Sequence, residues 1–378
     1  MATPRRPTYA EVNLGSLAFN FRSVKKFVGE NLEYMAVVKA NAYGHGAIFC
    51  AKKLEFEGVD WFGVALPEEG LELRENGIKT RILCLGSFWA GQEKLLLENN
   101  LTPVIYQLER AEKFNNAAKE KGITVKIHVK VDTGMGRIGV RFDEVKEFIY
   151  GLKKFKYLSV DGLMTHFAAA DNLLENDFTF AQIERFKEAV KMFEANGFRP
   201  RYKDLANSPG AIAHEKSRGN MVRLGGVLYG LGDDILPEKI FKPELKPVLS
   251  LKTQITHLKK VPKGETLGYS RIFTTKKDSV IATIPIGYQD GYSRALSNSG
   301  KVIVNDFFAP VVGRISMDWT IIDVTEIENV KVDDEVILIG KQNELEIRAK
   351  DLAQKLNTIS YEITCGVSNR VTRKYVES

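Results

Sequence analysis

A lysine stands at the end of a short apolar run near the N-terminus of the 378-residue chain. The run Met35–Val38 is typical of a buried strand, and Lys39 follows it directly. Burial removes water from an amine, lowers its pKa and favours the neutral form that a Schiff base requires. Taken alone, however, a lysine that extends to solvent from a strand end is the commoner case. The other strand ends therefore decide how Lys39 is interpreted.

Polar residues follow four later apolar runs in the same way. They are Asp132–Arg137, Thr165–His166, Asn207–Ser208, and Arg223 just before Gly225–Gly226. Because the carboxyl ends of parallel strands meet at one rim of a barrel, we expect these residues to converge. Ser208 opens a predicted helix and Gly225–Gly226 exposes backbone N–H groups, both in loops where barrels often bind phosphate.

A lysine, a phosphate site and a planar cation at one rim suggest pyridoxal phosphate. Lys39 would hold the cofactor through its amine, His166 could pack on the ring, and Arg223 could face the pyridine nitrogen. The residues thus predict a cofactor site that five strand ends assemble.

Eight apolar or β-rich runs alternate with amphipathic stretches before Pro243. The expected strands are Tyr34–Lys39, Trp61–Leu66, Ile82–Gly86, Pro103–Tyr106, Val125–Val131, Leu158–Met164, Tyr202–Ala206 and Met221–Gly225. Eight β-then-α repeats in a span of this length predict a (β/α)8 barrel of the TIM type. An open doubly wound sheet uses the same alternation, but eight strands favour closure.

The pattern changes after Pro243–Pro247, where short strands are punctuated by Gly, Asn, Asp and Pro. The expected strands are Val248–Thr256, Val280–Ile286, Val302–Val304, Pro310–Val312, Thr320–Val324 and Glu335–Ile339, and a helical stretch at Ala349–Leu356 follows them. We therefore expect an α/β chain in which the N-terminal barrel, residues 11–243, precedes a C-terminal mainly-β domain, residues 244–378.

Composition and charge exclude several classes of protein. The chain has 54 Lys+Arg and 48 Asp+Glu, and a net charge of +6 is too dilute to predict a nucleic acid or an anionic membrane as partner. No run approaches the ~18 apolar residues of a membrane span, and we see no signal peptide. Three separated cysteines fit a reducing, cytoplasmic location. Five histidines without a close pair predict no metal site.

The glycine-rich segment after the fifth expected strand admits other interpretations. Gly134, Gly136 and Gly139 match a dinucleotide fingerprint, with Asp161 placed for the ribose, so an NAD-dependent oxidoreductase is a rival. That fingerprint normally lies in the first βα unit of its domain, however. The triplet 132–134 is also similar to that of aspartic proteases, but a protease needs a second carboxylate and no second triplet occurs.

Residues 36–46, AVVKANAYGHG, resemble the pyridoxal-phosphate lysine motif of alanine racemases. Six further segments resemble motifs of that family and occur in the same order across essentially the whole chain. They are Lys130–Gly139, Leu205–Ser208, Met221–Gly225, Leu267–Ser270, Ile286–Tyr292 and Gly313–Asp318. One such motif would be weak evidence, whereas seven in order are very specific.

The resemblance implies an enzyme that interconverts L-alanine and D-alanine with pyridoxal 5'-phosphate and supplies D-alanine for peptidoglycan. It also implies a homodimer with shared active sites, in which residues 1–10 join the β domain; the strand-like Tyr9–Leu14 agrees with this. A related racemase for serine or lysine is the nearest alternative. A cofactor carrier on the same barrel would not need the β domain, and decarboxylase motifs are not matched.

The same resemblance assigns roles to individual residues. Lys39 would be the catalytic base on one face of the substrate, and Tyr269 of the partner subunit would be the base on the other. The cofactor would be bound by Lys39, Tyr43, His166, Asn207, Ser208, Arg223, Gly225, Gly226 and Tyr361. The substrate would be held by Arg137, Met317, Asp318 and Tyr288. Lys130 matches a lysine that is often carbamylated in the family, which would orient Arg137.

The chemistry of racemisation accounts for this set of residues. The α-proton must leave one face and return on the other, and two bases on opposite faces can do this without moving. A guanidinium such as that of Arg223 keeps its proton, so the ring beside it would be a weaker electron sink and transamination would be disfavoured. Asp204 departs from the histidine of the family; it could pair with Arg223, or it could be a solvated loop residue.

Overall fold

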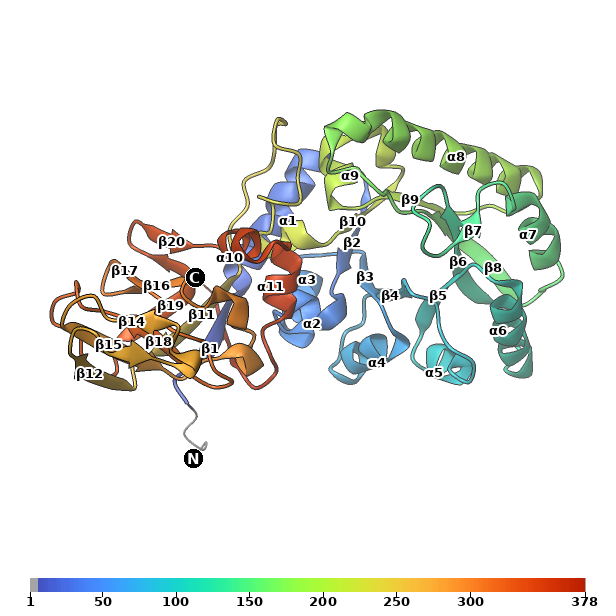
Figure 1. Ribbon diagram of the computed structural model, residues 1–378. Coiled ribbons are helices and arrows are strands. Elements are labelled where there is room, and N and C mark those ends of the chain that lie inside the picture. The colour runs from blue at the N-terminus through green and yellow to red at the C-terminus, as the bar shows by residue number, and fades with distance from the viewer. Residues whose placement is uncertain (1–5, 378) are drawn as a thin grey trace.

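Eight parallel strands close into a barrel in the computed structural model, which describes residues 6–377 (Figure 1). The strands are β2 (Glu33–Val37), β3 (Trp61–Val64), β4 (Arg81–Cys84), β5 (Leu101–Ile105), β6 (Val125–Asp132), β8 (Leu158–Met164), β9 (Tyr202–Ala206) and β10 (Met221–Leu224). The last strand pairs with the first, since β10 runs parallel to β2, and β5 pairs with β6. The predicted (β/α)8 barrel is confirmed, and the open-sheet alternative is wrong.

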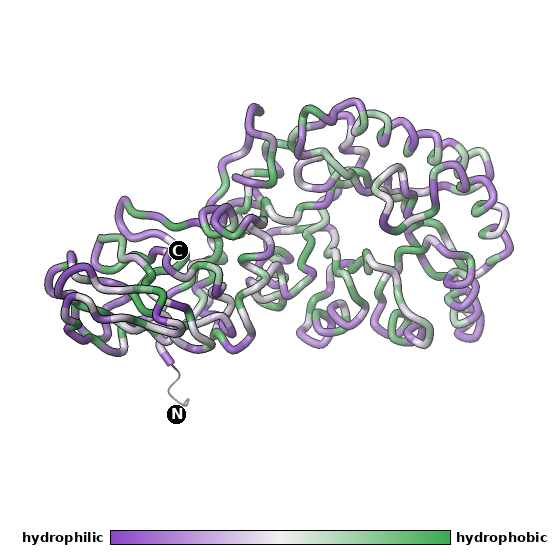
Figure 2. Tube along the Cα trace, viewed as in Figure 1, coloured by the Kyte–Doolittle hydropathy of each residue, from purple (hydrophilic) through white to green (hydrophobic). Residues whose placement is uncertain are grey.

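Helices surround the barrel strands (Figure 1). They are α1 (Leu14–Val28), α3 (Ala47–Phe56), α4 (Pro67–Glu75), α5 (Glu93–Glu98), α6 (Leu108–Glu120), α7 (Val145–Leu152), α8 (Asn176–Ala195) and α9 (Ser208–Ala213). On α1, the apolar residues at helical spacing, such as Leu17, Phe21 and Val24, are buried. Hydrophobic residues concentrate along the strands, and hydrophilic ones on the outer helices (Figure 2).

The floor of the barrel is filled by large side chains. The buried apolar cluster there comprises Met35, Trp61, Leu83, Val104, Met164, Tyr202 and Met221. His128 of β6 points into it, and its ring stacks on Tyr202 with the centroids 5.6 Å apart. Gly162 makes room for this ring, because a Cβ atom there would lie 2.5 Å from it. His128 is therefore packed inside the barrel, with no exposed surface.

The C-terminal part of the chain is mainly β, as predicted, and most of its strands pair antiparallel. They are β11 (Leu249–Gln254), β12 (His257–Val261), β13 (Thr266–Leu267), β14 (Phe273–Thr274), β15 (Ser279–Ile284), β16 (Lys301–Val304), β17 (Phe307–Pro310), β18 (Thr320–Asp323), β19 (Glu335–Gln342), β20 (Leu345–Ile347) and β21 (Thr372–Val376). Two helices, α10 (Ala349–Leu356) and α11 (Ser360–Cys365), pack beside them. The strand expected at Pro310–Val312 instead ends at Pro310, because β17 pairs with β16 in a hairpin.

The N-terminal strand β1 (Tyr9–Asn13) belongs to the same sheet as these C-terminal strands. It pairs antiparallel with β11 and parallel with β21. The expected strand Tyr9–Leu14 is one residue longer than the observed one, because Asn13 caps α1 by accepting from the Ser16 N–H at 2.8 Å. The chain therefore passes directly from the β domain, at β1, to the barrel, at α1.

Candidate active site

Lys39 follows β2 at the mouth of the barrel, where the chain enters the short turn α2 (Lys39–Tyr43). Residues 40–43 have φ angles between 51° and 54°, in the left-handed helical region. A left-handed helix costs L-residues roughly 1–2 kcal/mol each, so surrounding contacts must impose it. One is the backbone bond from the Ala42 N–H to the Val38 carbonyl, at 2.8 Å.

The amine of Lys39 lies in an environment that favours its neutral form. Burial lowers the pKa of Lys39, and the nearby guanidinium groups of Arg137 and Arg223 lower it further, against the opposite effect of Glu69. The neutral amine is the nucleophilic form that attacks an aldehyde. The strand-end lysine therefore has the property that the sequence pattern predicted.

Arg223 of β10 is buried and held in one orientation. Its guanidinium forms an ion pair with Asp204 of β9 and donates to the carbonyls of Thr165 at 2.9 Å and Leu205 at 3.2 Å. Asp204 has no exposed surface, so the predicted pairing is confirmed and the solvated alternative is wrong. Burial raises the pKa of Asp204 to about 6, although Arg223 acts to lower it.

His166 is kept neutral beside this guanidinium. Its Nδ1 atom lies 3.3 Å from Nη2 of Arg223. Because a guanidinium only donates, Nδ1 must accept, which leaves the ring proton on Nε2. Burial, and then the charge of Arg223, lower the pKa of His166 to about 2. An uncharged imidazole of this kind can pack against an aromatic ring.

Lys130 of β6 lies in the same charged cluster and is 5% exposed. Burial lowers its pKa to about 7, with further contributions from the cations Arg223 and Arg137, while Asp204 acts in the opposite direction. An ammonium at this position is therefore disfavoured near neutral pH. A neutral amine, or a modified one that carries negative charge, would fit the cluster better.

Gly225 and Gly226 follow β10, and their lack of side chains lets two tyrosine hydroxyl groups approach the backbone closely. A Cβ atom on Gly225 would lie 2.7 Å from the Tyr43 hydroxyl, and one on Gly226 would lie 2.6 Å from the Tyr361 hydroxyl. The N–H of Gly225 is also 2.9 Å from Oγ of Ser208, to which it donates. Three hydroxyl groups and backbone N–H groups thus gather in one cradle. This donor set fits the phosphate of pyridoxal phosphate.

The two tyrosines of this cradle come from different parts of the chain. Tyr43 belongs to the left-handed turn at the barrel mouth, and Tyr361 belongs to α11 beside the β domain. Their ring centroids are 5.4 Å apart. Asn207, also expected at the cofactor, has a local role, because its side chain caps α9 by accepting from the Gly210 N–H at 3.0 Å.

The glycine-rich segment after β6 is a tight loop that presents Arg137 at the barrel mouth. Asp132 shapes this loop by accepting from the N–H groups of Gly134 and Gly136, at 2.9 and 3.0 Å. The loop leads into the short strand β7 (Val140–Arg141), which pairs with β6. A dinucleotide fingerprint would lead into a helix at this point. The interpretation as a dinucleotide-binding site is therefore wrong.

Four of the expected site residues lie on an exposed rim of the β domain. Tyr269, Tyr288 and Met317 are 71%, 40% and 50% exposed. Asp318 forms an ion pair with Arg370 at 2.6 Å. The hairpin that carries Tyr269, β13–β14, lies in the β domain, well away from the mouth of the barrel (Figure 1). Within one chain, these four residues therefore do not contact Lys39.

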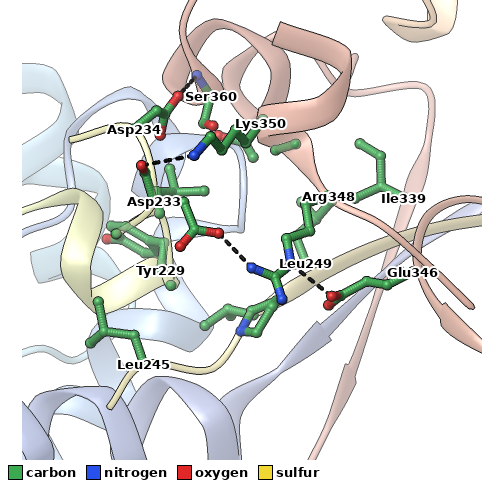
Figure 3. A pocket seen from close by; sticks show the side chains of 18 of the residues that line it. Tyr229, Asp233, Asp234, Leu245, Leu249, Ile339, Glu346, Arg348, Lys350 and Ser360 are labelled. Carbon is green, nitrogen blue, oxygen red and sulfur yellow. Dashed lines mark hydrogen bonds and ion pairs between the residues drawn. The ribbon is translucent and has the colours of Figure 1, made fainter. Parts of the chain in front are cut away.

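Two cavities lie outside the lysine cluster. One, of about 420 Å³, is open to solvent on the exposed rim and is lined by Tyr269, Arg314 and Trp319 among others. The other, of about 220 Å³, lies between the domains. Figure 3 shows its wall, where Arg348 reaches Asp233 at 2.6 Å. Neither cavity is lined by Lys39.

Sequence reasoning missed two residues that contact the lysine turn. Glu69 of α4 accepts from the Ala40 N–H at 2.7 Å. Arg373 of β21 donates to the Gly44 carbonyl through Nε at 3.1 Å and Nη2 at 3.0 Å. The position of Glu69 at the third residue of a helix could have indicated a cap, but nothing in the sequence indicated that either side chain reaches Lys39's turn.

Two negative findings concern the residues that the structure describes, 6–377. None of their helices has both the length and the apolar character needed to cross a membrane. Within the same range, no three His, Cys, Asp or Glu side chains are grouped so that they could hold a metal ion.

Comparisons with known proteins cover almost the entire chain. Residues 12–233 match the family model for the N-terminal domain of alanine racemase, and residues 248–375 match that for its C-terminal domain. The alanine racemase of Halothermothrix orenii is 45% identical over 370 residues, 98% of this chain and 97% of that protein.

Solved structures agree with the sequence comparisons. The alanine racemase of Clostridium difficile 630 superimposes with a TM-score of 0.93 at 39% identity, covering 100% of this chain and 97% of that one. An alanine racemase from Bartonella henselae with covalently bound pyridoxal phosphate superimposes with a TM-score of 0.87 at 28% identity, covering 99% of this chain and 100% of that one.

Proposed function

The chain belongs to the alanine racemase family, and on that premise we propose that it interconverts L-alanine and D-alanine with pyridoxal 5'-phosphate held on the amine of Lys39. The observation that carries this proposal is the buried lysine whose turn also supplies Tyr43 to the group of hydroxyl and backbone N–H donors around Gly225. Tyr43, Ser208, Tyr361 and the backbone of Gly225 would hold the phosphate. When bound, the cofactor would withdraw electrons from Cα of the substrate and so acidify its α-hydrogen.

Arg223 would face the pyridine nitrogen, and Asp204 would set its orientation. The guanidinium is already bonded to Asp204 and to two backbone carbonyls, so it has one position. Because it holds its protons at ordinary pH, it would donate a hydrogen bond to the ring without transferring a proton. His166, uncharged, would pack beside the ring without adding a competing cation.

Two bases would act on opposite faces of the substrate. Lys39, once its amine is released, would remove or return the α-proton on one face, and Tyr269 of the partner subunit would do so on the other. Within one chain, Tyr269 is exposed, and β14, the second strand of its hairpin, lies in the β domain and away from the barrel strands (Figure 1). We therefore propose a homodimer in which each barrel mouth receives the rim of the partner's β domain. Arg137 and the rim residues Met317, Asp318 and Tyr288 would then hold the substrate.

Lys130 would be carbamylated. The neutral amine attacks carbon dioxide, an N–C bond forms as one C–O π bond breaks, and the nitrogen releases one proton, so the side chain changes from neutral to anionic. The lowered pKa of Lys130, about 7, makes the neutral amine available near neutral pH. The anion would pair with Arg137 and turn it toward a substrate carboxylate. Uptake of ¹³C-bicarbonate, seen as a carbamate resonance that a Lys130→Met variant lacks, would test this step.

The test of the main proposal is a visible spectrum before and after borohydride, followed by incubation with L-alanine and chiral chromatography. We expect a yellow protein whose reduced adduct maps to Lys39 and which forms D-alanine. Serine and lysine should be offered in parallel, because a yellow protein that racemises one of them and leaves alanine unchanged would be a related racemase. A protein that takes up no pyridoxal phosphate would contradict the proposal altogether.

A further inference from the structure

We propose that Arg373, in the last strand of the β domain, is a positioning residue that locks the lysine-bearing left-handed turn to the β domain and so assembles the cofactor's phosphate cradle. This inference rests on the proposed function. Arg373 touches neither Lys39 nor the cradle directly, and it would act through the backbone of Gly44.

The turn needs external support because of its backbone. Residues 40–43 all have φ near 50°, a conformation that non-glycine residues keep only where their surroundings impose it. On the barrel side, Glu69 holds the start of the turn through the Ala40 N–H, while its second carboxylate oxygen accepts from the Ala65 and Leu66 N–H groups. At the other end of the turn, Nδ1 of His45 donates to the Ala42 and Tyr43 carbonyls, at 2.9 and 3.0 Å. Arg373 bonds this end of the turn to the β domain.

The guanidinium of Arg373 joins the turn to the segment that follows α11. Two of its nitrogens donate to the Gly44 carbonyl, at 3.1 and 3.0 Å. It also donates to the carbonyls of Val367, Ser368 and Val371. All these acceptors are backbone carbonyl oxygens. The position of the guanidinium therefore depends on the backbone of two chain segments and not on an acidic side chain. A guanidinium offers five N–H donors in a fixed planar fork, whereas a lysine offers three on one rotatable nitrogen.

The geometry around this arginine leaves little freedom. A Cβ atom on Gly44 would lie 2.0 Å from the Thr364 carbonyl of α11, and one on Gly46 would lie 1.9 Å from the Tyr375 hydroxyl of β21. The backbone at Gly44 is therefore in direct contact with the backbone of α11, and the backbone at Gly46 is in contact with the Tyr375 side chain. Because α11 also carries Tyr361, holding Gly44 against α11 sets the distance between the two tyrosines of the cradle.

An arginine between two domains could also act only as a structural link, and Arg348 provides the matched control. It bridges the β domain to the barrel through Asp233 at 2.6 Å (Figure 3) but contacts no residue of the lysine turn. If any interdomain arginine had the same effect, Arg348→Met and Arg373→Met would behave alike. If Arg373 positions the turn, only Arg373→Met should weaken cofactor binding.

The experiment measures pyridoxal phosphate binding to the apoprotein by absorbance titration, and amide hydrogen exchange of residues 40–46. For Arg373→Met we expect a dissociation constant raised by about 10- to 100-fold, because charge-assisted bonds to the turn are lost. We also expect faster exchange in this segment. Arg348→Met should change neither quantity. Arg373→Lys, which keeps the charge but not the fork, should give an intermediate dissociation constant.

Normal cofactor affinity and unchanged exchange in Arg373→Met would overturn the inference, as would an equal loss in Arg348→Met. If Arg373→Met does not fold, the comparison between Arg373→Lys and wild type decides in the same way: unchanged affinity and exchange refute the role. Failure of the proposed function would look different, because the wild-type protein itself would then bind no pyridoxal phosphate or leave alanine unchanged.

Discussion

The mouth of the barrel and the rim of the β domain would supply the two halves of one active site, yet they are held in opposite ways. At the mouth, Arg223 and Asp204 are buried and bonded to each other. On the rim, Tyr269 is 71% exposed and Met317 is 50% exposed. In the homodimer that we propose, the first half would be ordered by its own chain, whereas the second half would be covered by a second surface.

The reason lies in the chemistry that each half would perform. A cofactor held covalently needs fixed partners for its phosphate and its ring, and a closed barrel provides them from neighbouring strand ends. The second base, on the opposite face of the substrate, would come from another subunit in the homodimer that we propose. A base on another subunit would face Lys39 across the substrate, and the active site would then depend on dimer formation.

The sharpest test of the comparison removes one base from each half. Lys39→Ala and Tyr269→Phe should each lower kcat by about 10²–10⁴-fold, the range expected for loss of a general base. Only Lys39→Ala should abolish the borohydride-reducible adduct. After subunit exchange, a mixture of the two variants should recover part of the activity, because each heterodimer has one intact site. No recovery in a mixture shown to contain heterodimers would contradict shared sites.

The buried half should be sensitive to loss of one charge. Asp204→Ala leaves Arg223 without its carboxylate, and breaking a buried pair in this way is expected to lower the free energy of unfolding by about 3–5 kcal/mol. Glu194→Ala is the control, because both side chains of its pair with Lys203 are exposed and the pair should contribute under about 1 kcal/mol. Urea titration measures both. Equal decreases in the free energy of unfolding would mean that burial does not make the Arg223 pair more important for stability than a surface pair.

The exposed half should be sensitive to loss of an apolar contact. Trp319, 48% exposed beside Tyr269, would be covered in the dimer. Trp319→Glu should raise the dimer dissociation constant by about 30-fold, as loss of an interface hot spot does. Phe56→Glu, on α3 and 84% exposed, should leave it unchanged. Sedimentation at a series of concentrations measures this, and a wild-type dissociation constant for Trp319→Glu would place the interface elsewhere.

His128, buried in the barrel floor, should make the free energy of unfolding depend on pH. Burial lowers the pKa of His128 to about 3, whereas an unfolded histidine titrates near 6.5. Below pH 6.5 the unfolded chain therefore binds a proton at His128 that the native chain does not bind. The free energy of unfolding then decreases by about 1.4 kcal/mol for each unit by which the pH falls. In His128→Leu, the slope of unfolding free energy between pH 6 and pH 4 should decrease by this amount. An unchanged slope would mean that His128 is protonated in the native state.

Strands with strong patterns could be predicted from the sequence, and short or polar ones could not. The run Leu158–Met164 matches β8 at both ends. Two-residue strands such as β13 and β14 have no period to detect, and β12, HLKKV, is too polar to be distinguished from a turn. These strands exist because neighbouring strands supply hydrogen-bonding partners, not because of their own composition.

The amino-acid sequence by itself determined which chemistry the barrel mouth could perform, because residue types and their positions after apolar runs are local properties. It indicated Lys39, Arg223 and the glycines of the cradle. Only the tertiary structure decided that Asp204 pairs with Arg223, and that residues 40–43 form a left-handed turn held by Arg373. These contacts join residues far apart in the chain, so their geometry exists only once the barrel has closed against the β domain.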